Sequence, residues 1–166
     1  MKTITIGGNT THLAGDVPAV GLQAPQFSAV KGDLSVTGLK DFAGRRVILN
    51  IFPSLDTPIC AASVRRFNKE AAQLDNTVVL CISKDLPFAQ GRFCTTEGLD
   101  GVVPLSTFND TSFDQAYGLL VAEGPLKGLY ARTVIVLDEA GKIIYEEVVS
   151  ELKTEPNYEA ALNALK

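Results

Sequence analysis

Apolar residues follow two patterns along the chain, one typical of buried strands and the other of amphipathic helices. Two short continuous runs, 46–52 and 77–83, are rich in branched aliphatic residues and predict central strands of a sheet. A third apolar stretch, 131–149, is divided by the turn residues Asp-Glu-Ala-Gly and predicts a β-hairpin. Alternating residues 3–6, followed by Gly-Gly-Asn, predict a smaller hairpin at the N-terminus.

Predicted helices occupy much of the sequence between these strands. One is expected from Pro58 to residues 75–76, a second from Pro87 to near Gly98 and a short third over 112–118, which follows a short strand at 104–108. Residues 155–166 predict an amphipathic C-terminal helix, with apolar side chains at i, i+3, i+4 and i+7. The order β-α-β-α-β-(α)-β-β-α implies right-handed crossovers within one mixed sheet. It predicts an α/β protein with a thioredoxin-like fold: a mixed central sheet flanked by helices, with an N-terminal β-hairpin. No repeat or linker interrupts residues 1–166, so a single domain is expected.

Composition narrows the function classes. The chain is 46% hydrophobic and 20% charged, which is typical of a globular protein. Its net charge is −4, and its longest basic run is the pair Arg45-Arg46, so nucleic-acid binding is not expected. The N-terminus lacks the features of a signal peptide, and no apolar run reaches the roughly 18 residues of a membrane span. A cytoplasmic location without membrane attachment is therefore expected, and thiols are normally kept reduced there.

The chain holds three cysteines, Cys60, Cys81 and Cys94, and a single histidine, His12. None of the cysteines forms a Cys-x-x-Cys pair, and no His/Cys cluster has the spacing of zinc ligands. A metal site is therefore not expected. An odd number of cysteines allows one redox pair and one bystander.

Cys60 is the cysteine best placed for chemistry. Pro58 suits the first position of a helix and Thr57 suits the N-cap, so Cys60 falls in the first turn. Free N–H groups and the positive end of the helix dipole favour a thiolate at this position. Cys60, Val64 and Phe67 also have the spacing of a core-facing stripe, so an inert buried cysteine fits the pattern as well. The residues alone leave both interpretations open.

The segment "PSLDTPIC", residues 53–60, has the spacing Pro-x-x-x-Thr-x-x-Cys. This motif and its surroundings, together with "TVVLCISKDLPFAQGRFC" and "GPLKGL" further along, resemble the peroxiredoxins. The resemblance is to the thiol peroxidase branch, the atypical two-cysteine peroxiredoxins, and it covers essentially the whole chain. A lone Thr-x-x-Cys motif has little specificity, whereas this combination is highly specific.

The resemblance implies a role for each of several residues. Cys60 becomes the peroxidatic cysteine, a partly buried nucleophile. It attacks hydrogen peroxide or an organic hydroperoxide, including alkyl and lipid hydroperoxides, and forms a sulfenic acid. Thr57 directs its hydroxyl at the sulfur, Pro53 shields the pocket, and Arg132 supplies fixed donors and a positive charge. The residues alone favour an N-cap for Thr57 and a solvated surface side chain for Arg132, and Pro53 could be a simple strand terminator.

The resemblance also assigns the other cysteines and the partners. Cys94 is the resolving cysteine, which forms an intramolecular disulfide with Cys60. From the residues alone, Cys94 is equally a core cysteine of a helix. Both cysteines belong to predicted helices, so at least one helix is expected to unwind locally if the thiols start far apart. Cys81, inside a buried strand, is expected to be a bystander. The resemblance further implies thioredoxin as reductant, a homodimer, and no bound cofactor.

Two other functions use the same residues. A cysteine hydrolase would need a histidine base for Cys60, and His12, near the N-terminal hairpin turn, is the only histidine. A non-catalytic redox sensor or thioredoxin-fold binding module would use the same cysteine pair. It would differ from a peroxidase only in rate and partner.

Overall fold

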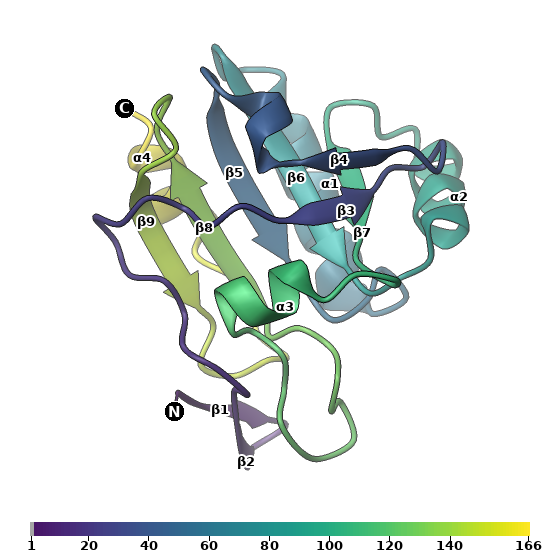
Figure 1. The fold of residues 1–166 in the computed structure, drawn as a ribbon. Helices are drawn as coiled ribbons and strands as arrows, with labels where there is room; N and C mark the ends of the chain where they lie inside the picture. Colours follow the sequence, from purple (N-terminus) through teal and green to yellow (C-terminus); the bar gives the residue numbers. More distant parts are fainter. Residues whose placement is uncertain (1) are drawn as a thin grey trace.

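The computed structural model describes residues 2–166 (Figure 1). The strands are β1 (Thr3–Ile6), β2 (Asn9–His12), β3 (Ser28–Val30), β4 (Val36–Gly38), β5 (Arg46–Ile51), β6 (Thr77–Ser83), β7 (Val103–Ser106), β8 (Thr133–Leu137) and β9 (Ile143–Val148). The helices are α1 (Pro58–Ala71), α2 (Pro87–Glu97), α3 (Ser112–Tyr117) and α4 (Tyr158–Asn163), with a 3-10 helix, η1, at Leu39–Phe42.

Seven of these strands form one mixed sheet in the order β4-β3-β7-β6-β5-β8-β9. β5, β6 and β7 are parallel, whereas β8 runs antiparallel to β5 and β9 antiparallel to β8. The β1–β2 hairpin is separate and lies at the lower edge in Figure 1. It is attached to the segment after β9, because the Thr5 N–H donates to the Ser150 carbonyl and the Leu152 N–H donates to the Thr5 carbonyl. This arrangement confirms the predicted thioredoxin-like fold with its N-terminal hairpin.

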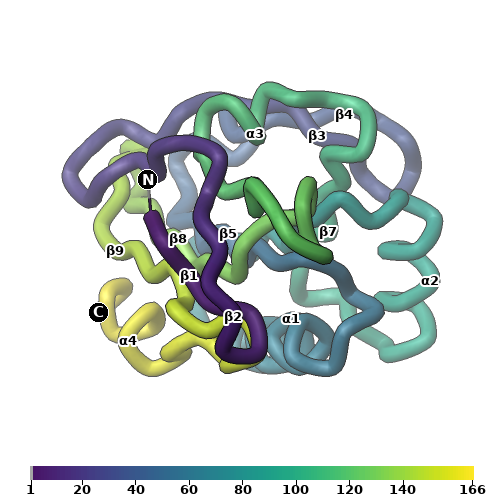
Figure 2. The backbone as a smooth tube through the Cα atoms, turned by 90° about the horizontal axis from the view of Figure 1, so that it is seen from below, coloured from purple at the N-terminus to yellow at the C-terminus, as the bar shows by residue number. Residues whose placement is uncertain are grey.

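The two faces of the sheet are covered by different helices (Figure 2). α1 and α4 pack on one face, and α3 packs on the other with the segment that follows β2. Side chains of a strand alternate between the faces, so Leu49 and Ile51 belong to the α3 side while Ile48 belongs to the α1 side. In β6 the same alternation places Cys81 on the α1 side. Cys60 packs in the same apolar cluster.

Several boundaries differ from the predicted ones. α1 ends at Ala71, several residues early, because the backbone changes there to i→i−3 turn bonds, from the Gln73 N–H to the Glu70 carbonyl and from the Leu74 N–H to the Ala71 carbonyl. Asn76, with a positive φ of 46°, lies beyond this end. Leu74 still packs against the core, although it lies outside the helix. The C-terminal helix begins only at Tyr158, where the Asn157 side chain caps it by accepting from the Ala160 N–H at 3.0 Å.

Sequence patterning missed β3 and β4, because strands of three residues are too short to show alternation.

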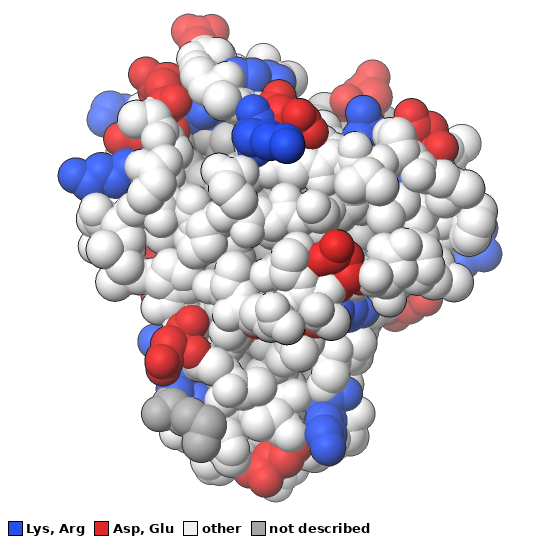
Figure 3. All heavy atoms as spheres, viewed as in Figure 1, with Lys and Arg blue, Asp and Glu red and all other residues white. Residues whose placement is uncertain are grey.

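On the face drawn in Figure 3, charged side chains of both signs lie mostly towards the rim, and one acidic group interrupts the uncharged centre. Within residues 2–166 no helix is long and apolar enough to cross a membrane.

Candidate active site

The candidate site lies at the edge of the sheet where β5 and β6 end and β8 begins. β5 and β6 are parallel, with Ile51 opposite Ile82, so the loops that follow both strands leave from the same edge. β8 is antiparallel to β5, with Thr133 opposite Ile51, so the residue that precedes β8 lies at this edge too. The carboxyl ends of parallel strands are the usual location of ligand sites in α/β proteins.

Cys60 lies in the first turn of α1, as predicted. The first backbone hydrogen bond of the helix runs from the Ala61 N–H to the Thr57 carbonyl at 3.0 Å. The N–H of Cys60, one residue earlier, therefore has no carbonyl of the helix to donate to. The side chain is 0% exposed and packs with Val64 and Phe67. Cys60 is therefore more deeply buried than the partial burial expected from the sequence, and it is both a core residue and a helix N-terminal thiol.

Arg132 makes direct contact with the sulfur of Cys60. Its Nη1 lies 3.1 Å from Cys60 Sγ, and its Nε donates to the Leu152 carbonyl at 3.0 Å. The arginine is only 3% exposed, so this positive charge acts in surroundings that hold little water. The alternative of a solvated surface arginine is wrong, because the side chain is buried. The register of β5 with β8 places residue 132 at the start of the loop that leads from β5 to Cys60.

Arg65 and Arg66 are different from Arg132. Both lie on the surface of α1, where their side chains are more than a third exposed. Arg65 pairs with Glu97, and Arg66 pairs with Glu70 along the same helix. Neither pair involves the sulfur of Cys60.

The loop before Cys60 carries the other two site residues named from the motif. Thr57 occupies the N-cap position and is half-buried, but its side chain makes no capping bond. Its hydroxyl instead donates to the Ser54 carbonyl at 2.9 Å, which leaves the oxygen lone pairs free to accept. Pro53 is buried, two residues after the end of β5.

The three cysteines are free thiols in different surroundings. Cys81 is 2% exposed, and burial raises the pKa of its thiol to about 12, with neighbouring Cys94 adding to the rise. Cys94 is half-buried on α2, and burial raises the pKa of its thiol as well. It lines a surface hollow of about 310 Å³ with Gly98 and Asp100. Cys94 is thus the more accessible of the two thiols outside α1.

His12 is engaged elsewhere. Its Nδ1 lies 3.1 Å from a carboxylate oxygen of Glu123 at the edge of the N-terminal hairpin. This pairing directs the imidazole towards Glu123, so a hydrolase mechanism lacks a histidine base at Cys60. Among residues 2–166 no group of three or more His, Cys, Asp and Glu side chains is arranged to hold a metal ion.

Sequence reasoning missed two adjacent residues, Lys84 and Asp85, which follow β6 at the same edge. The carboxylate of Asp85 accepts from the Ser54 hydroxyl and from the Leu55 N–H, both in the loop before Cys60. Asp85 is separated from these partners by about thirty residues along the chain, so no local pattern could reveal the contact.

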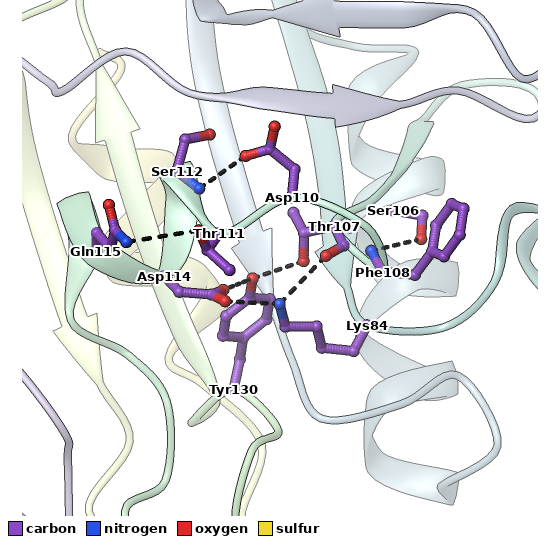
Figure 4. Close-up of polar contacts among 10 residues, drawn as sticks. All are labelled: Lys84, Ser106, Thr107, Phe108, Asp110, Thr111, Ser112, Asp114, Gln115 and Tyr130. Atoms are coloured by element: carbon purple, nitrogen blue, oxygen red, sulfur yellow. Dashed lines mark hydrogen bonds and ion pairs between the residues drawn. The ribbon is translucent and has the colours of Figure 1, made fainter.

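Lys84 belongs to a second polar network, drawn in Figure 4. Its ammonium group contacts Asp114 on α3 at 2.7 Å and the Thr107 carbonyl at 3.2 Å. Asp114 also accepts from the hydroxyl of Tyr130, which precedes Arg132 by two residues. Burial, with a smaller effect of Asp114, raises the pKa of Tyr130 and keeps it a neutral donor. The network ties the end of β6 to the segment that leads to Arg132.

Comparison with known proteins identifies close relatives. A family model described as Redoxin matches residues 19–162. A thiol peroxidase of Corynebacterium glutamicum is 54% identical over 158 residues, which is 95% of this chain and 95% of the relative. A thiol peroxidase of Mycobacterium tuberculosis is 52% identical over 165 residues, or 99% of each chain.

Two solved structures are also similar to this chain. A peroxiredoxin-like protein from Aquifex aeolicus is 35% identical with a TM-score of 0.94, covering 99% of this chain and 96% of that one. A thiol peroxidase from Chromobacterium violaceum shares the fold, with a TM-score of 0.88 at 23% identity, over 98% of this chain and 94% of that one.

Proposed function

The chain belongs to the redoxin family and, within it, to the thiol peroxidases, which reduce peroxides with a cysteine thiol; we propose that Cys60 is the thiol that reacts. One observation carries this assignment: the guanidinium of Arg132 lies 3.1 Å from the Cys60 sulfur, and both residues are buried. A permanent positive charge beside a thiol at a helix N-terminus stabilises the thiolate, which is the nucleophilic form.

In the first step the Cys60 thiolate attacks one oxygen of a hydroperoxide. An S–O bond forms and the O–O bond breaks, so that the sulfur is oxidised to a sulfenic acid and the peroxide is reduced. The leaving oxygen takes up a proton and departs as water or as an alcohol. Arg132 stabilises the negative charge on this oxygen, while Thr57 supplies a hydroxyl and Pro53 excludes water. The substrates are hydrogen peroxide and organic hydroperoxides, including alkyl and lipid hydroperoxides.

In the second step Cys94 resolves the sulfenic acid. The Cys94 sulfur forms an S–S bond with Cys60, the S–O bond breaks and water leaves. The half-burial of Cys94 on α2, beside the sheet face that α1 covers, supports this choice over the buried Cys81. Thioredoxin then reduces the disulfide with the two electrons of its own dithiol, so the cycle requires no bound cofactor.

The chain acts as a single domain of residues 1–166 and forms a homodimer. Leu86, Phe88 and Phe108 are 51%, 66% and 44% exposed, and such apolar side chains suit a protein interface. Ser106, which donates to the Asp85 carbonyl, holds the segments that carry them together. The need for a dithiol reductant is consistent with a cytoplasmic location.

The decisive experiment measures peroxide turnover. Purified protein is mixed with hydrogen peroxide or cumene hydroperoxide and recycled by thioredoxin, and the wild type is compared with Cys60→Ser and with the matched control Cys81→Ala. We expect Cys60→Ser to abolish turnover and Cys81→Ala to retain it. Oxidation of the wild type at the rate of an ordinary free thiol would overturn the proposed function, as would a fully active Cys60→Ser variant.

A further inference from the structure

The Asp85 carboxylate is the meeting point of several hydrogen bonds at the active-site edge. One oxygen accepts from the Ser54 hydroxyl at 2.7 Å, and the other accepts from the Leu55 N–H at 2.8 Å and the Ser83 hydroxyl at 2.7 Å. Hydrogen bonds to an ionised carboxylate are about twice as strong as neutral ones. Asp85 therefore fastens the loop that precedes Cys60 to the end of β6.

The same network continues from Ser83 into α2, the helix that carries Cys94. Gln90 is 0% exposed, and its amide donates to the Ser83 hydroxyl at 3.1 Å and to the Leu105 carbonyl at 3.0 Å. Pro87 and Gln90 are the fully buried residues of this helix, and the Gln90 Oε1 is buried without a partner among the described residues. A series of hydrogen bonds therefore runs from Asp85 through Ser83 to Gln90 and helps to hold α2 on the sheet. The unpaired Gln90 Oε1 lowers the stability of this arrangement.

The backbone of residues 84 and 85, the corner that follows β6, is held independently of the Asp85 side chain. The Ser106 hydroxyl donates to the Asp85 carbonyl at 2.5 Å. Lys84, the preceding residue, is tied to Asp114 and to the Thr107 carbonyl (Figure 4). Removal of the Asp85 carboxylate therefore releases the Cys60 loop while these other contacts keep the corner in place.

We propose that Asp85 is a positioning residue that locks the Cys60 loop and α2 in the peroxide-reducing arrangement, and that the disulfide step requires this lock to open. The inference rests on the proposed roles of Cys60 and Cys94. Loop residues 53–57 carry Pro53 and Thr57, so Asp85, by holding this loop, fixes the positions of both residues before α1 while the peroxide reacts. The two free thiols have different surroundings: Cys60 is buried beside Arg132, whereas Cys94 lines a surface hollow with Gly98 and Asp100. One or both segments must therefore move for the Cys60–Cys94 bond to form.

The surroundings of Cys94 agree with such a sequence of events. Burial raises the pKa of its thiol, so the thiolate that attacks the sulfenic acid forms more readily once α2 loosens and admits water. The lock therefore affects the two steps in opposite directions. It speeds the reaction of Cys60 with peroxide, and it slows the formation of the disulfide.

Asp85→Ala tests the inference, with Asp56→Ala as the matched control. Asp56 is an exposed carboxylate of the same loop, so its removal changes the loop charge and leaves the lock intact. Rapid-quench mixing with peroxide, followed by thiol labelling and mass spectrometry, separates the peroxide-dependent oxidation of Cys60 from the peroxide-independent formation of the disulfide.

In Asp85→Ala we expect oxidation about tenfold slower and disulfide formation about fivefold faster, as for the loss of charge-assisted hydrogen bonds. Asp56→Ala should match the wild type in both rates. A purely structural role of Asp85 would lower the melting temperature without speeding disulfide formation, so wild-type values of either rate in Asp85→Ala would overturn the inference.

Two milder variants keep the test valid if Asp85→Ala does not fold. Asp85→Asn retains one acceptor oxygen, and Ser54→Ala removes one bond from the loop side only. In both variants we expect slower oxidation and faster disulfide formation, as in Asp85→Ala, by smaller factors. If both rates fell, or both rose, the result would count against the lock. If the wild type forms a Cys60–Cys94 disulfide and the variants behave like it, only this inference fails. If the wild type forms no such disulfide, the proposed function fails and the inference falls with it.

Discussion

Replacement of Arg132 by alanine is the sharpest test of how the site activates its thiol. The guanidinium is 3% exposed and lies 3.1 Å from the Cys60 sulfur, so little water is present to screen the interaction. A second hydrogen bond, from Nε to the Leu152 carbonyl, fixes the orientation of the guanidinium. Arg132→Ala removes the charge and both donors, whereas Arg132→Lys keeps the charge but lacks the planar guanidinium with its fixed donors.

The magnitude follows from the geometry. Two unit charges about 4 Å apart attract each other by about 4 kcal/mol at an effective dielectric constant of about 20. A hydrogen bond to a charged group contributes about 1.5–3 kcal/mol net. A loss of about 2–4 kcal/mol corresponds to oxidation of Cys60 slowed by about 30- to 700-fold, since about 1.4 kcal/mol is a factor of ten. Arg132→Lys should lie between the wild type and Arg132→Ala.

The chain contains no tryptophan, so its own indole fluorescence cannot report the reaction. Oxidation of Cys60 is followed instead by competition with a haem peroxidase for limiting hydrogen peroxide at pH 7. Arg66→Ala is the matched control, because Arg66 lies on the same helix as Cys60 but pairs with surface carboxylates. Its rate should stay within about twofold of the wild type, as expected for exposed ion pairs. An Arg132→Ala variant that reacts within threefold of the wild type would refute the electrostatic reasoning.

The other predictions concern the resolving thiol, the loop hydroxyl and the N-terminal hairpin. Cys94→Ser should leave the first oxidation intact and stop recycling by thioredoxin; loss of recycling in Cys81→Ala instead would reassign the resolving cysteine. Thr57→Val, which keeps the shape and removes the hydroxyl, should slow oxidation by about tenfold or more; an unchanged rate would reduce Thr57 to its bond with the loop backbone. N–H groups, first that of Lys153, lower the pKa of Glu151 from 4.5 to about 2. A carboxyl with a depressed pKa stabilises the fold above its unfolded pKa and loses that effect as pH falls from about 4.5 towards 2. The melting temperature of Glu151→Gln should therefore fall less over this range than that of the wild type, and parallel curves would contradict the assignment.

Local sequence was sufficient for most of the fold, because hydrophobic period, proline and turn residues act over a few positions. The buried runs became β5 and β6, and Pro58 began α1 with Cys60 in its first turn. Periodicity was least informative where segments are short, as for β3, β4 and the early end of α1. There, pairing and turn geometry outweigh the local pattern.

The sequence by itself determined the type of each main element, the position of the reactive thiol at a helix N-terminus and, through a specific motif, the identity of its family. Only the tertiary structure placed Arg132 against the Cys60 sulfur, 72 residues away along the chain, and Asp85 against the loop that precedes Cys60. These contacts depend on the register of β5 with β6 and β8, a relation between distant segments that no local pattern records. The physical reason is that periodicity shows which face of a strand is buried, whereas its pairing with other strands determines which loop ends meet.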